Sequence, residues 1–423
     1  MKILWLTNIV LPQAAKLHGI VGGSNGGGWM VSQLEALSTK DFLQVTVVSP
    51  SEQVTAIETA QKGNITYITF PVKEEGQRLF QSILRKEKPD VVHIFGTEFK
   101  QCYDMLCVCD VDRAAVSIQG LVGEYSKYTQ IGLPKNILRF SPIKNLIYRF
   151  FKVPSAALTK RDMENRGVYE AQALKKAKHI LGRTQWDKAC CLAINPDLTY
   201  HFCNELLRKE FYTQDQWQPE SCRAHSIFIS QGDYAIKGLH IFLPVFAQIL
   251  KEIPDSMLYV AGNEQKSHKN PIKQWIGDYV YDYGAYINRL IDQYSLKGHI
   301  EFLGSLTPSQ MKEQFLSANV FLSCSTIENS PNSIGEAMLL GVPIVASEVG
   351  GVPSIFTGGE DGVLYPLTEG EKAKEGILEI FKNPRRAQEY GSCAKAHAMK
   401  THNVEATTDG LIKIYSDLSK GDI

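Results

Sequence analysis

The sequence shows no excess of either charge: its 423 residues include 45 Lys and Arg residues and 45 Asp and Glu residues. A balanced chain lacks the general basic surface with which many proteins bind nucleic acid, so we expect no nucleic acid partner. The nine cysteines are odd in number and form no Cys-x-x-Cys pair, which argues against a disulfide scaffold and against a zinc or thioredoxin-type site. These features predict a globular protein of a reducing, cytoplasmic compartment.

Long apolar runs are absent as well. No stretch approaches the roughly 18 to 20 apolar residues that a helix needs to cross a bilayer, so we expect no integral membrane protein. The N-terminal run MKILWLTNIVLP places one lysine before a short apolar stretch, as a signal peptide does. A glycine-rich segment follows where a cleavage site of small residues would stand, and we therefore interpret the run as a buried first strand.

Short runs of apolar and β-branched residues alternate with segments of helical periodicity. One series of such runs occupies the first half of the chain, at 2–6, 44–48, 65–70, 91–95, 115–118 and 179–181. A second series occupies the other half, at 225–229, 257–261, 300–303, 320–323, 343–346 and 363–365. This alternation is typical of parallel sheets flanked by helices, so the expected fold class is α/β with two Rossmann-like, doubly wound domains.

The polar segment 212–224 lies between the two series and has the composition of a linker. We therefore expect a first domain over 1–215 and a second over 216–403. A last helical segment, 404–418, follows the complete second series and carries on one apolar stripe Leu411, Ile412, Ile414, Tyr415 and Leu418. We expect the terminal segment 404–423 to bury this stripe against the first domain.

Glycines gather directly after the first expected strand, in Gly22-Gly23-Ser24-Asn25-Gly26-Gly27-Gly28. Glycines at such a junction let the backbone approach an anion at a helix N-terminus, where free N–H groups and the helix dipole favour phosphate. Gly27 and Gly28 are therefore candidate donor-binding residues. The segment lacks the Gly-x-Gly-x-x-Gly spacing of dinucleotide sites, and a merely flexible loop is the alternative interpretation.

Two glutamates, Glu328 and Glu336, lie eight residues apart after the expected strand 320–323. The carboxyl end of a parallel strand is where open α/β sheets bind ligands, and a carboxylate there can accept hydrogen bonds from sugar hydroxyls. The alternative is structural, because Ser333 and Glu336 have the spacing of a capping box before the apolar run 337–340.

The surroundings of this Glu-x7-Glu element resemble the retaining nucleotide-sugar glycosyltransferases of the GT-B fold, family four. The resemblance continues through Gly341-Val342-Pro343, Gly350-Gly351-Val352-Pro353 and Asp361-Gly362. It implies two Rossmann-like domains that face a central cleft, the first on the acceptor side and the second binding the nucleotide-sugar donor. It also implies a hexosyltransferase that retains the anomeric configuration, with the nucleotide sugar as a substrate and no metal or other cofactor.

Roles for individual residues follow from the resemblance. Glu328 would hold the hydroxyls of the transferred sugar and Glu336 those of the ribose, while Lys237, after the expected strand 225–229, would neutralise the diphosphate. Glu328 and Lys237 are thus the candidate catalytic residues. The turn and helix start between the two glutamates would present backbone N–H groups to the donor, and the candidate donor-binding residues there are Asn329, Ser330, Asn332 and Ser333.

Two positions depart from the family pattern. Gln231 and Gly232 stand where the family usually carries an arginine, and Gln119 stands where it commonly carries a histidine that helps to hold the donor sugar. Gln119 can form hydrogen bonds with the donor but cannot act as a general base. Arg183, after the expected strand 179–181, is a candidate replacement for the missing arginine, and its alternative is a surface ion-pair residue.

The run 91–98 places His93 and Glu98 at another strand end, where we interpret them as candidate acceptor-side residues. A histidine with purely structural hydrogen bonds is the alternative for His93. The triplet Asp110-Val111-Asp112 matches the metal-carrying motif of the other major glycosyltransferase fold. So short a motif has a high false-positive rate, and we assign no metal site to it.

The segment 125–161 contains eight Lys and Arg residues and no Asp or Glu, with aromatic and aliphatic residues between the cations. This composition suits an anionic membrane surface or a lipid diphosphate acceptor. The alternative is a helical segment that exposes its polar face to solvent and packs its apolar face on the first domain. We therefore expect a cytoplasmic protein that is peripheral at the inner face of the membrane.

The expected function is retaining transfer of a sugar from a nucleotide-diphosphate sugar, UDP more than GDP, to a glycan or lipid-linked acceptor in surface polysaccharide biosynthesis. Two alternatives stay open. One is a sugar-nucleotide epimerase of the same fold. The other is a non-catalytic nucleotide-sugar-binding subunit, which the missing arginine and histidine would explain.

Overall fold

The computed structural model describes residues 1–21, 27–135, 137–138, 146, 156–263 and 282–421. By its internal contacts the chain divides into two compact units. Unit 1 comprises residues 1–124, 165–209 and 401–423, and unit 2 comprises residues 125–164 and 210–400. No helix in the described part of the chain combines the length and the apolar character needed to span a membrane.

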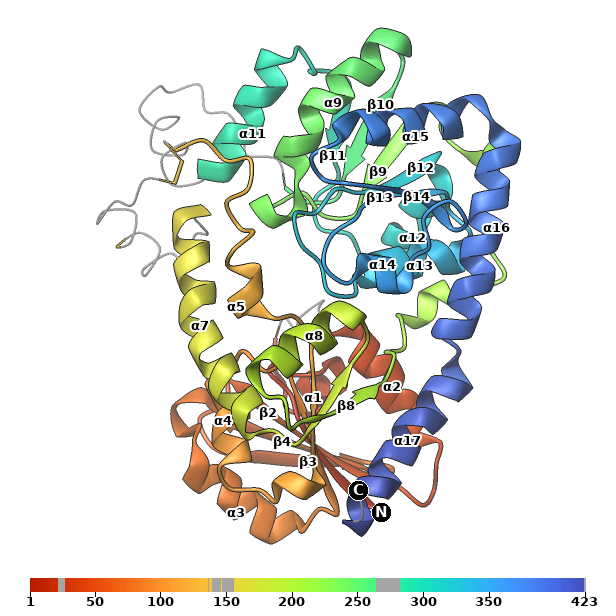
Figure 1. The fold of residues 1–423 in the computed structure, drawn as a ribbon. Helices are drawn as coiled ribbons and strands as arrows, with labels where there is room; N and C mark the ends of the chain where they lie inside the picture. The colour runs from red at the N-terminus through yellow and green to blue at the C-terminus, as the bar shows by residue number, and fades with distance from the viewer. Residues whose placement is uncertain (22–26, 136, 139–145, 147–155, 264–281, 422–423) are drawn as a thin grey trace. The chain divides into compact units, whose positions relative to one another are not determined.

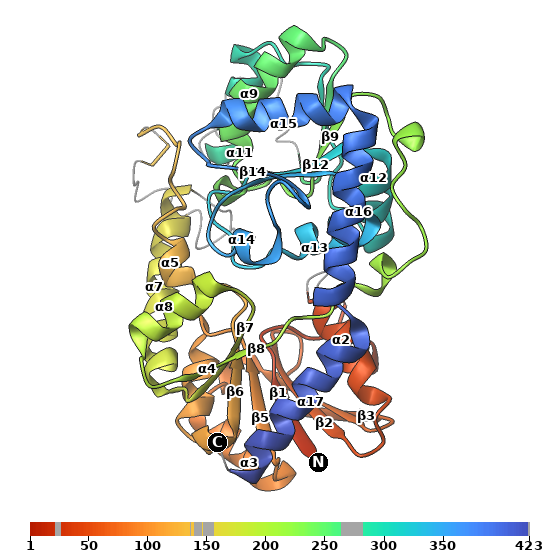
Figure 2. The same cartoon turned by 45° about the vertical axis from the view of Figure 1, so that its right-hand side comes forward.

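Unit 1 is built on a sheet with the strand order β3-β4-β2-β1-β5-β6-β7-β8 (Figures 1 and 2). Its strands are β1 (Lys2–Leu6), β2 (Gln44–Ser51), β3 (Glu58–Lys62), β4 (Ile65–Pro71), β5 (Val91–Phe95), β6 (Ala114–Ser117), β7 (His179–Gly182) and β8 (Thr199–Phe202). Its helices are α1 (Pro12–Leu17), α2 (Gly28–Ser38), α3 (Gln77–Glu87), α4 (Lys100–Leu106), α5 (Val122–Tyr125), α8 (Gln185–Ile194), α17 (Val404–Lys420) and most of α7 (Ala156–Lys176).

Unit 2 is built on a parallel sheet with the order β11-β10-β9-β12-β13-β14. Its strands are β9 (Ser226–Ile229), β10 (Met257–Val260), β11 (Ile300–Phe302), β12 (Val320–Ser323), β13 (Ile344–Ser347) and β14 (Gly362–Tyr365). Its helices include α9 (Leu239–Glu252), α11 (Asp282–Gln293), α12 (Pro308–Ser317), α13 (Asn332–Leu340), α14 (Val352–Ile355), α15 (Gly370–Lys382) and α16 (Pro384–Thr401). This is the doubly wound order expected for a Rossmann-like domain.

Each expected run forms a strand, and β1, β5 and β12 have the predicted bounds. These runs are continuous in apolar residues because a parallel sheet covered on both faces buries every side chain of its central strands, as in β5 and β12. Two strands were not predicted. β3 is polar and pairs antiparallel with β4, and β8 is a short, half-exposed strand at the opposite edge of the sheet.

The C-terminal helix α17 completes the core of unit 1, where it contacts α2 and β5 (Figure 2). Leu411, Tyr415 and Leu418 are buried in one cluster with Trp5 of β1. Asn403 caps the N-terminus of the helix with its side chain. The last helix of the chain thus covers the first strand.

Residues 125–164 group with unit 2, whereas we expected them inside a first domain over 1–215. The hydroxyl of Thr326 donates to the carbonyl oxygen of Tyr128 (3.1 Å), and the ring of His240 bonds the carbonyl oxygen of Ile131 (2.9 Å). Such contacts between distant parts of the chain leave no local sequence signal. Residues 136, 139–145 and 147–155 of the basic segment lie outside the described residues, and with them the cations Arg139, Lys144, Arg149 and Lys152.

The polar segment 212–224 is anchored to unit 2 by one aromatic side chain. Trp217 is 4 % exposed, and its indole N–H donates to the carbonyl oxygen of Ala318 (2.7 Å). Its backbone N–H donates to the carbonyl oxygen of Leu340 (2.9 Å). The segment therefore packs as part of unit 2, and the boundary between the units falls at Lys209 instead of residue 215.

A buried carboxylate supports the short helix α5 of unit 1. Glu170 on α7 accepts hydrogen bonds from the backbone N–H groups of Val122 and Gly123, both at 2.9 Å. Burial, helped by the nearby carboxylate of Glu98, raises the pKa of Glu170 to about 7, although the hydrogen bonds from Gly123 and Val122 oppose the rise. Between pH 4.5 and about 7 the folded chain therefore holds a proton that the unfolded chain has released, so this group makes stability fall as the pH rises.

We expect the substitution Glu170→Gln to remove this contribution to the pH dependence. A rise of the pKa from 4.5 to about 7 corresponds to about 3 kcal/mol in the free energy of unfolding. The natural protein loses this stability relative to the variant as the pH rises from 4.5 to about 7. Denaturant unfolding of both proteins at several pH values between about 5 and about 8 measures the difference. If the free energies of unfolding of the two proteins change with pH in the same way, Glu170 is not the titrating group.

Candidate functional site

The sheet of unit 2 has a switch point between its neighbouring central strands β9 and β12. From there the chain continues outwards to β10 and β11 on one side, and to β13 and β14 on the other. Open α/β sheets bind ligands at such a point, because the loops that leave the two strands diverge. Lys237 follows β9 and Glu328 follows β12, so both candidate catalytic residues lie at this switch point.

Lys237 and Glu328 form an ion pair with 2.6 Å between Nζ and Oε1. The hydroxyl of Ser325 donates a second hydrogen bond to the same oxygen (2.8 Å). The two charged side chains are 19 % and 10 % exposed, so water screens the pair only weakly. Burial alone would lower the pKa of Lys237, but Glu328 and Tyr234 together raise it, and the ammonium group stays charged.

Helix α13 begins shortly after Glu328, and no side chain caps its N-terminus. Pro331 is the N-cap residue and Ser333 lies inside the first turn, so Ser333 and Glu336 do not form the capping box that was the alternative interpretation. The backbone of Pro331 is extended, and the helix therefore starts at Asn332. The N-cap residue thus offers no side-chain acceptor to the N–H groups of the first turn, and N–H groups at a helix N-terminus can bind an anion.

The other candidate donor-binding residues lie around this helix start. Glu336, on α13, is 2 % exposed, and Asn329 is 1 % exposed in the turn before the helix. Ser330, Asn332 and Ser333 are half-buried. The structure therefore brings the predicted residues of the second domain to one edge of one sheet.

Two glycines let the loops approach each other around the ion pair. Gly238 has a φ of +74°, and a Cβ atom there would overlap the carbonyl oxygen of Cys324. Gly350 has a φ of +51°, and a Cβ atom there would overlap the carbonyl oxygen of Glu328. Both positions require glycine, for the left-handed backbone and for the close approach.

We expect Gly238→Ala to destabilise unit 2 by about 3 kcal/mol and to weaken nucleotide binding at least about tenfold, because strain and overlap displace Lys237. Gly359→Ala is the matched control: its φ is also positive, at +84°, but no atom lies within 4 Å of the added Cβ. The control should cost about 1–2 kcal/mol and leave nucleotide affinity unchanged. Thermal unfolding and titration with UDP measure both quantities, and equal effects of the two substitutions would contradict the assignment.

In unit 1, Gly27 and Gly28 lie at the start of α2, as expected, and Gly27 has a φ of +75°. A Cβ atom on Gly27 would overlap the side chain of Ile9, and Gly28 lies against the side chain of Arg208. Arg208 was not predicted near this loop, because it lies far along the chain. Residues 22–26 of the glycine-rich segment lie outside the described residues.

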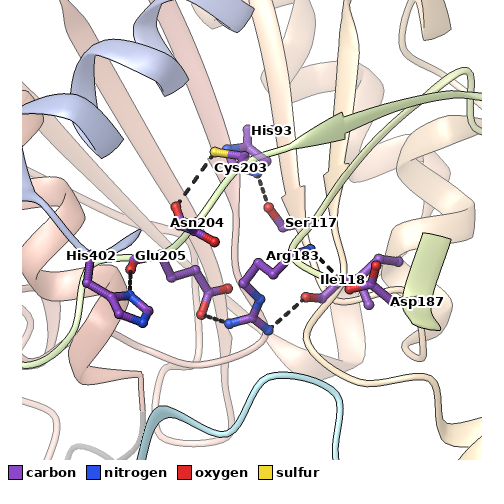
Figure 3. Close-up of polar contacts among 9 residues, drawn as sticks. All are labelled: His93, Ser117, Ile118, Arg183, Asp187, Cys203, Asn204, Glu205 and His402. Atoms are coloured by element: carbon purple, nitrogen blue, oxygen red, sulfur yellow. Dashed lines mark hydrogen bonds and ion pairs between the residues drawn. The ribbon is translucent and has the colours of Figure 1, made fainter. Parts of the chain in front are cut away.

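Arg183 forms a buried network after β7. Figure 3 shows its guanidinium group between the carboxylate of Glu205 and the carbonyl oxygen of Ile118, at 3.2 Å from the latter. Burial raises the pKa of Glu205 to about 7, and the charge of Arg183 opposes this rise. His402 bonds the backbone carbonyl oxygen of Glu205 (3.1 Å). With a side chain only 6 % exposed, Arg183 has the geometry of a structural ion-pair residue, but a buried one and not the surface one that we considered.

His93 lies in the interior of unit 1 and is 2 % exposed. Its Nδ1 atom is 2.6 Å from the hydroxyl of Tyr415, and its Nε2 atom is 2.7 Å from the hydroxyl of Ser117 (Figure 3 shows the Ser117 bond). Burial lowers the pKa of His93 to about 3, so the ring is neutral. Since both ring nitrogens are used within the core, the geometry favours the structural interpretation of His93 over an acceptor-side role.

Glu98 and Gln119 come together at Gly96. A Cβ atom on Gly96 would lie 2.8 Å from Oε2 of Glu98 and 3.4 Å from Oε1 of Gln119. Oε1 of Glu98 is 3.4 Å from Arg166, whereas Oε2 has no hydrogen-bond partner among the described residues. Burial raises the pKa of Glu98. These two side chains thus lie close together after β5 and β6.

The two aspartates of the Asp-x-Asp triplet are used in local contacts. Asp110 accepts a hydrogen bond from the N–H of Asp112 (3.1 Å), and Asp112 forms an ion pair with Lys178. Within the ranges that the structure describes, no group of three or more His, Cys, Asp or Glu side chains is arranged to hold a metal ion.

Residues 223–397 match the family model described as glycosyl transferases group 1. Spore coat protein SA of Bacillus subtilis (strain 168) is 22 % identical over 183 residues, which are 43 % of this chain and 45 % of that protein, so the match spans about half of that relative.

Two solved structures share the fold over nearly the whole chain. Sucrose-phosphate synthase from Thermosynechococcus elongatus has a TM-score of 0.68 at 15 % identity, covering 99 % of both chains. Anabaena HepE in complex with UDP-glucose has a TM-score of 0.64 at 16 % identity, covering 99 % of this chain and 100 % of that one. The chain therefore has the GT-B fold, and its residues 223–397, which include Lys237, Glu328 and Glu336, match the group 1 glycosyl transferases.

Proposed function

We propose that this chain is a retaining glycosyltransferase that transfers a sugar from a nucleotide-diphosphate sugar, UDP more than GDP, to a glycan or lipid-linked glycan. The observation that carries the proposal is the ion pair of Lys237 and Glu328 at the switch point of unit 2, followed by the uncapped N-terminus of α13. This combination offers a cation and N–H groups to a diphosphate, and a carboxylate to sugar hydroxyls. The solved complex of Anabaena HepE with UDP-glucose supports a UDP donor.

In this proposal, Lys237 neutralises the charge that the diphosphate gains as it leaves the anomeric carbon. Glu328 accepts hydrogen bonds from the hydroxyls of the transferred sugar, and Glu336 from those of the ribose. An acceptor hydroxyl forms the new bond on the face from which the diphosphate departs, and its proton leaves with the nucleoside diphosphate. Since Lys237 and helix N–H groups supply the positive charge, we propose that transfer needs no metal and continues in EDTA.

We also propose that the enzyme acts in surface polysaccharide biosynthesis and binds the cytoplasmic face of the membrane through the segment 125–161. Its composition supports this, and Lys127 and Lys135 of the described part are exposed. Flotation with anionic and neutral liposomes at low and high salt tests the association. Salt-sensitive binding to anionic vesicles alone is the expected result, and no binding, or equal binding to both vesicles, contradicts it.

The second candidate function is a non-catalytic nucleotide-sugar-binding subunit, which Gln231 and Gln119 favour because they replace the arginine and histidine of the family pattern. The chain is incubated with labelled UDP-glucose, UDP-galactose or UDP-N-acetylglucosamine, with and without a glycan extract. A labelled glycan whose NMR spectrum shows the anomeric configuration of the donor supports the proposed transfer. An epimerised sugar nucleotide formed without extract indicates an epimerase, and donor binding without turnover indicates the binding subunit.

A further inference from the structure

Unit 1 contains a cavity of about 380 Å³ between its outer strands and the helices that cover them. The start of α1, one side of α2 and the hairpin of β3 and β4 enclose it. Cavities of this size, lined mainly by apolar side chains with a few polar groups among them, are typical binding sites for small molecules. This cavity has both features, an apolar wall and a small number of polar side chains.

The apolar wall is formed by core residues of unit 1. Leu11, Leu34 and Ile65 are buried, and Val31 on α2 is half-buried. All four pack in the same hydrophobic cluster as Trp5 of β1. The wall is therefore held by packed helices and strands, and an apolar ligand would remove the remaining apolar surface from water.

Tyr67 of β4 adds a polar group to this wall. Its side chain lines the cavity and the residue is only 2 % exposed, yet its hydroxyl forms no hydrogen bond with any residue that the structure describes. Buried tyrosine hydroxyls usually have a hydrogen-bond partner. Burial, helped by the carboxylate of Glu35, raises the pKa of Tyr67 to about 12, so the hydroxyl keeps its proton at neutral pH and can donate it to a ligand.

Lys62 of β3 brings a positive charge to the same cavity. In the antiparallel pair of β3 and β4, Lys62 lies opposite Ile65, and Tyr67 is two residues further along β4. Lys62 and Tyr67 are therefore diagonal neighbours on one face of the sheet, with about 7–8 Å between them, which a long side chain can span. The ammonium group is 3.3 Å from Oε1 of Gln13, a neutral acceptor, and it has no carboxylate partner in the described part of the chain.

The charges of the lining residues decide which ligand suits the cavity. Glu35 on α2 carries the other charge of the lining, and its Oε1 is 3.9 Å from Nζ of Lys209. The side chain of Glu35 is 58 % exposed, so water and Lys209 screen its charge, whereas Lys62 meets only a neutral amide. A carboxylate can accept hydrogen bonds from both the Lys62 ammonium and the Tyr67 hydroxyl, while an ammonium group on the ligand would be repelled by Lys62.

We propose that this cavity binds a small apolar carboxylate, whose hydrocarbon part packs on the apolar wall and whose carboxylate is bonded by Tyr67 and Lys62. The cavity reaches residues 63 and 64, the turn that precedes β4, and so lies toward the amino edge of the sheet. It is therefore distinct from the strand ends at the carboxyl edges. All its lining residues belong to unit 1, so the inference does not rest on the proposed transfer.

Saturation-transfer NMR titration of the full chain tests the site with two carboxylates, octanoate and 3-phenylpropanoate, which differ in the shape of the apolar part. The alcohol and the amine with the same hydrocarbon part are the comparisons. We expect at least one carboxylate to bind, at least about tenfold more tightly than its alcohol and its amine. Tyr67→Phe and Lys62→Met should each weaken the binding of that carboxylate about fivefold to tenfold.

Lys16→Met is the matched control, because Lys16 is an exposed lysine of α1 that does not line the cavity, and it should leave carboxylate binding unchanged. Tyr67→Phe should not lower the melting temperature of the free protein, since the hydroxyl has no partner in the described protein. Failure of both carboxylates to bind, equal binding of the alcohol or the amine, or unchanged affinity in both site variants would overturn the proposal. Titration of the same protein with UDP reports on unit 2, so either proposal can fail while the other stands.

Discussion

Glu328→Ala is expected to abolish sugar transfer and to lower the stability of unit 2 by about 3 kcal/mol. Transfer is lost because the transferred sugar loses its carboxylate acceptor at the switch point. Stability is lost because Lys237, whose Nζ is 2.6 Å from Glu328, becomes a shielded charge without its partner. Activity alone therefore does not separate a catalytic role from a structural one, and the experiment needs a ligand and a second variant.

The ligand is UDP, whose diphosphate can replace the lost carboxylate as the counter-charge of Lys237. In the proposed site, UDP should raise the melting temperature of Glu328→Ala by more than it raises that of the natural protein, although the variant is inactive. The double variant Glu328→Ala, Lys237→Met removes both charges, and it should regain stability while losing this response to UDP. An equal response of the single variant and the natural protein would show that Lys237 does not meet the diphosphate.

Tyr415→Phe is expected to lower the stability of unit 1 by about 2–4 kcal/mol, although only one hydroxyl group is removed. That hydroxyl accepts a hydrogen bond from the indole N–H of Trp5 (2.9 Å) and bonds Nδ1 of His93 (2.6 Å). All three side chains are at most 2 % exposed, so the substitution leaves two polar atoms unpaired in the core. The helix α17 then loses the polar contacts that orient it on β1 and β5.

Calorimetric unfolding of Tyr415→Phe measures this effect, and Tyr169→Phe is the control because Tyr169 is 38 % exposed on α7. The control should unfold like the natural protein. If both variants are as stable as the natural protein, the hydroxyl of Tyr415 does not hold α17 and His93 in place.

The strands of both sheets could be predicted because their central positions are buried on both faces and read as unbroken apolar runs. The polar strand β3 gives no such signal, since Glu58–Lys62 lies at an edge and faces solvent on most of its length. The grouping of residues 125–164 with unit 2 was not predictable for another reason. It rests on single contacts such as Thr326 with Tyr128, which nothing in the local sequence marks.

The candidate site could be predicted where its residues come directly after a strand. Glu328 was identified from its position after a strand and Lys237 from the resemblance to the family, and the fold makes the two preceding strands neighbours. The part played by Ser325 was not predicted, because a serine after a strand is common and only the structure shows its bond to Glu328.

The roles of other side chains depend on partners that a local pattern does not reveal. Arg183 is held by Glu205, and the environment of His93 depends on Tyr415 from the other end of the chain.

The central claim is that the switch point of unit 2 binds a nucleoside diphosphate, and a thermal-shift panel of UDP, GDP and ADP tests it most directly. A ligand that binds only the folded chain stabilises it by about 2.7 kcal/mol at a hundred times its dissociation constant. We predict a shift with UDP that Glu336→Ala abolishes and Gly359→Ala preserves. No shift with any of the three nucleotides, or a shift that survives Glu336→Ala, would contradict the claim.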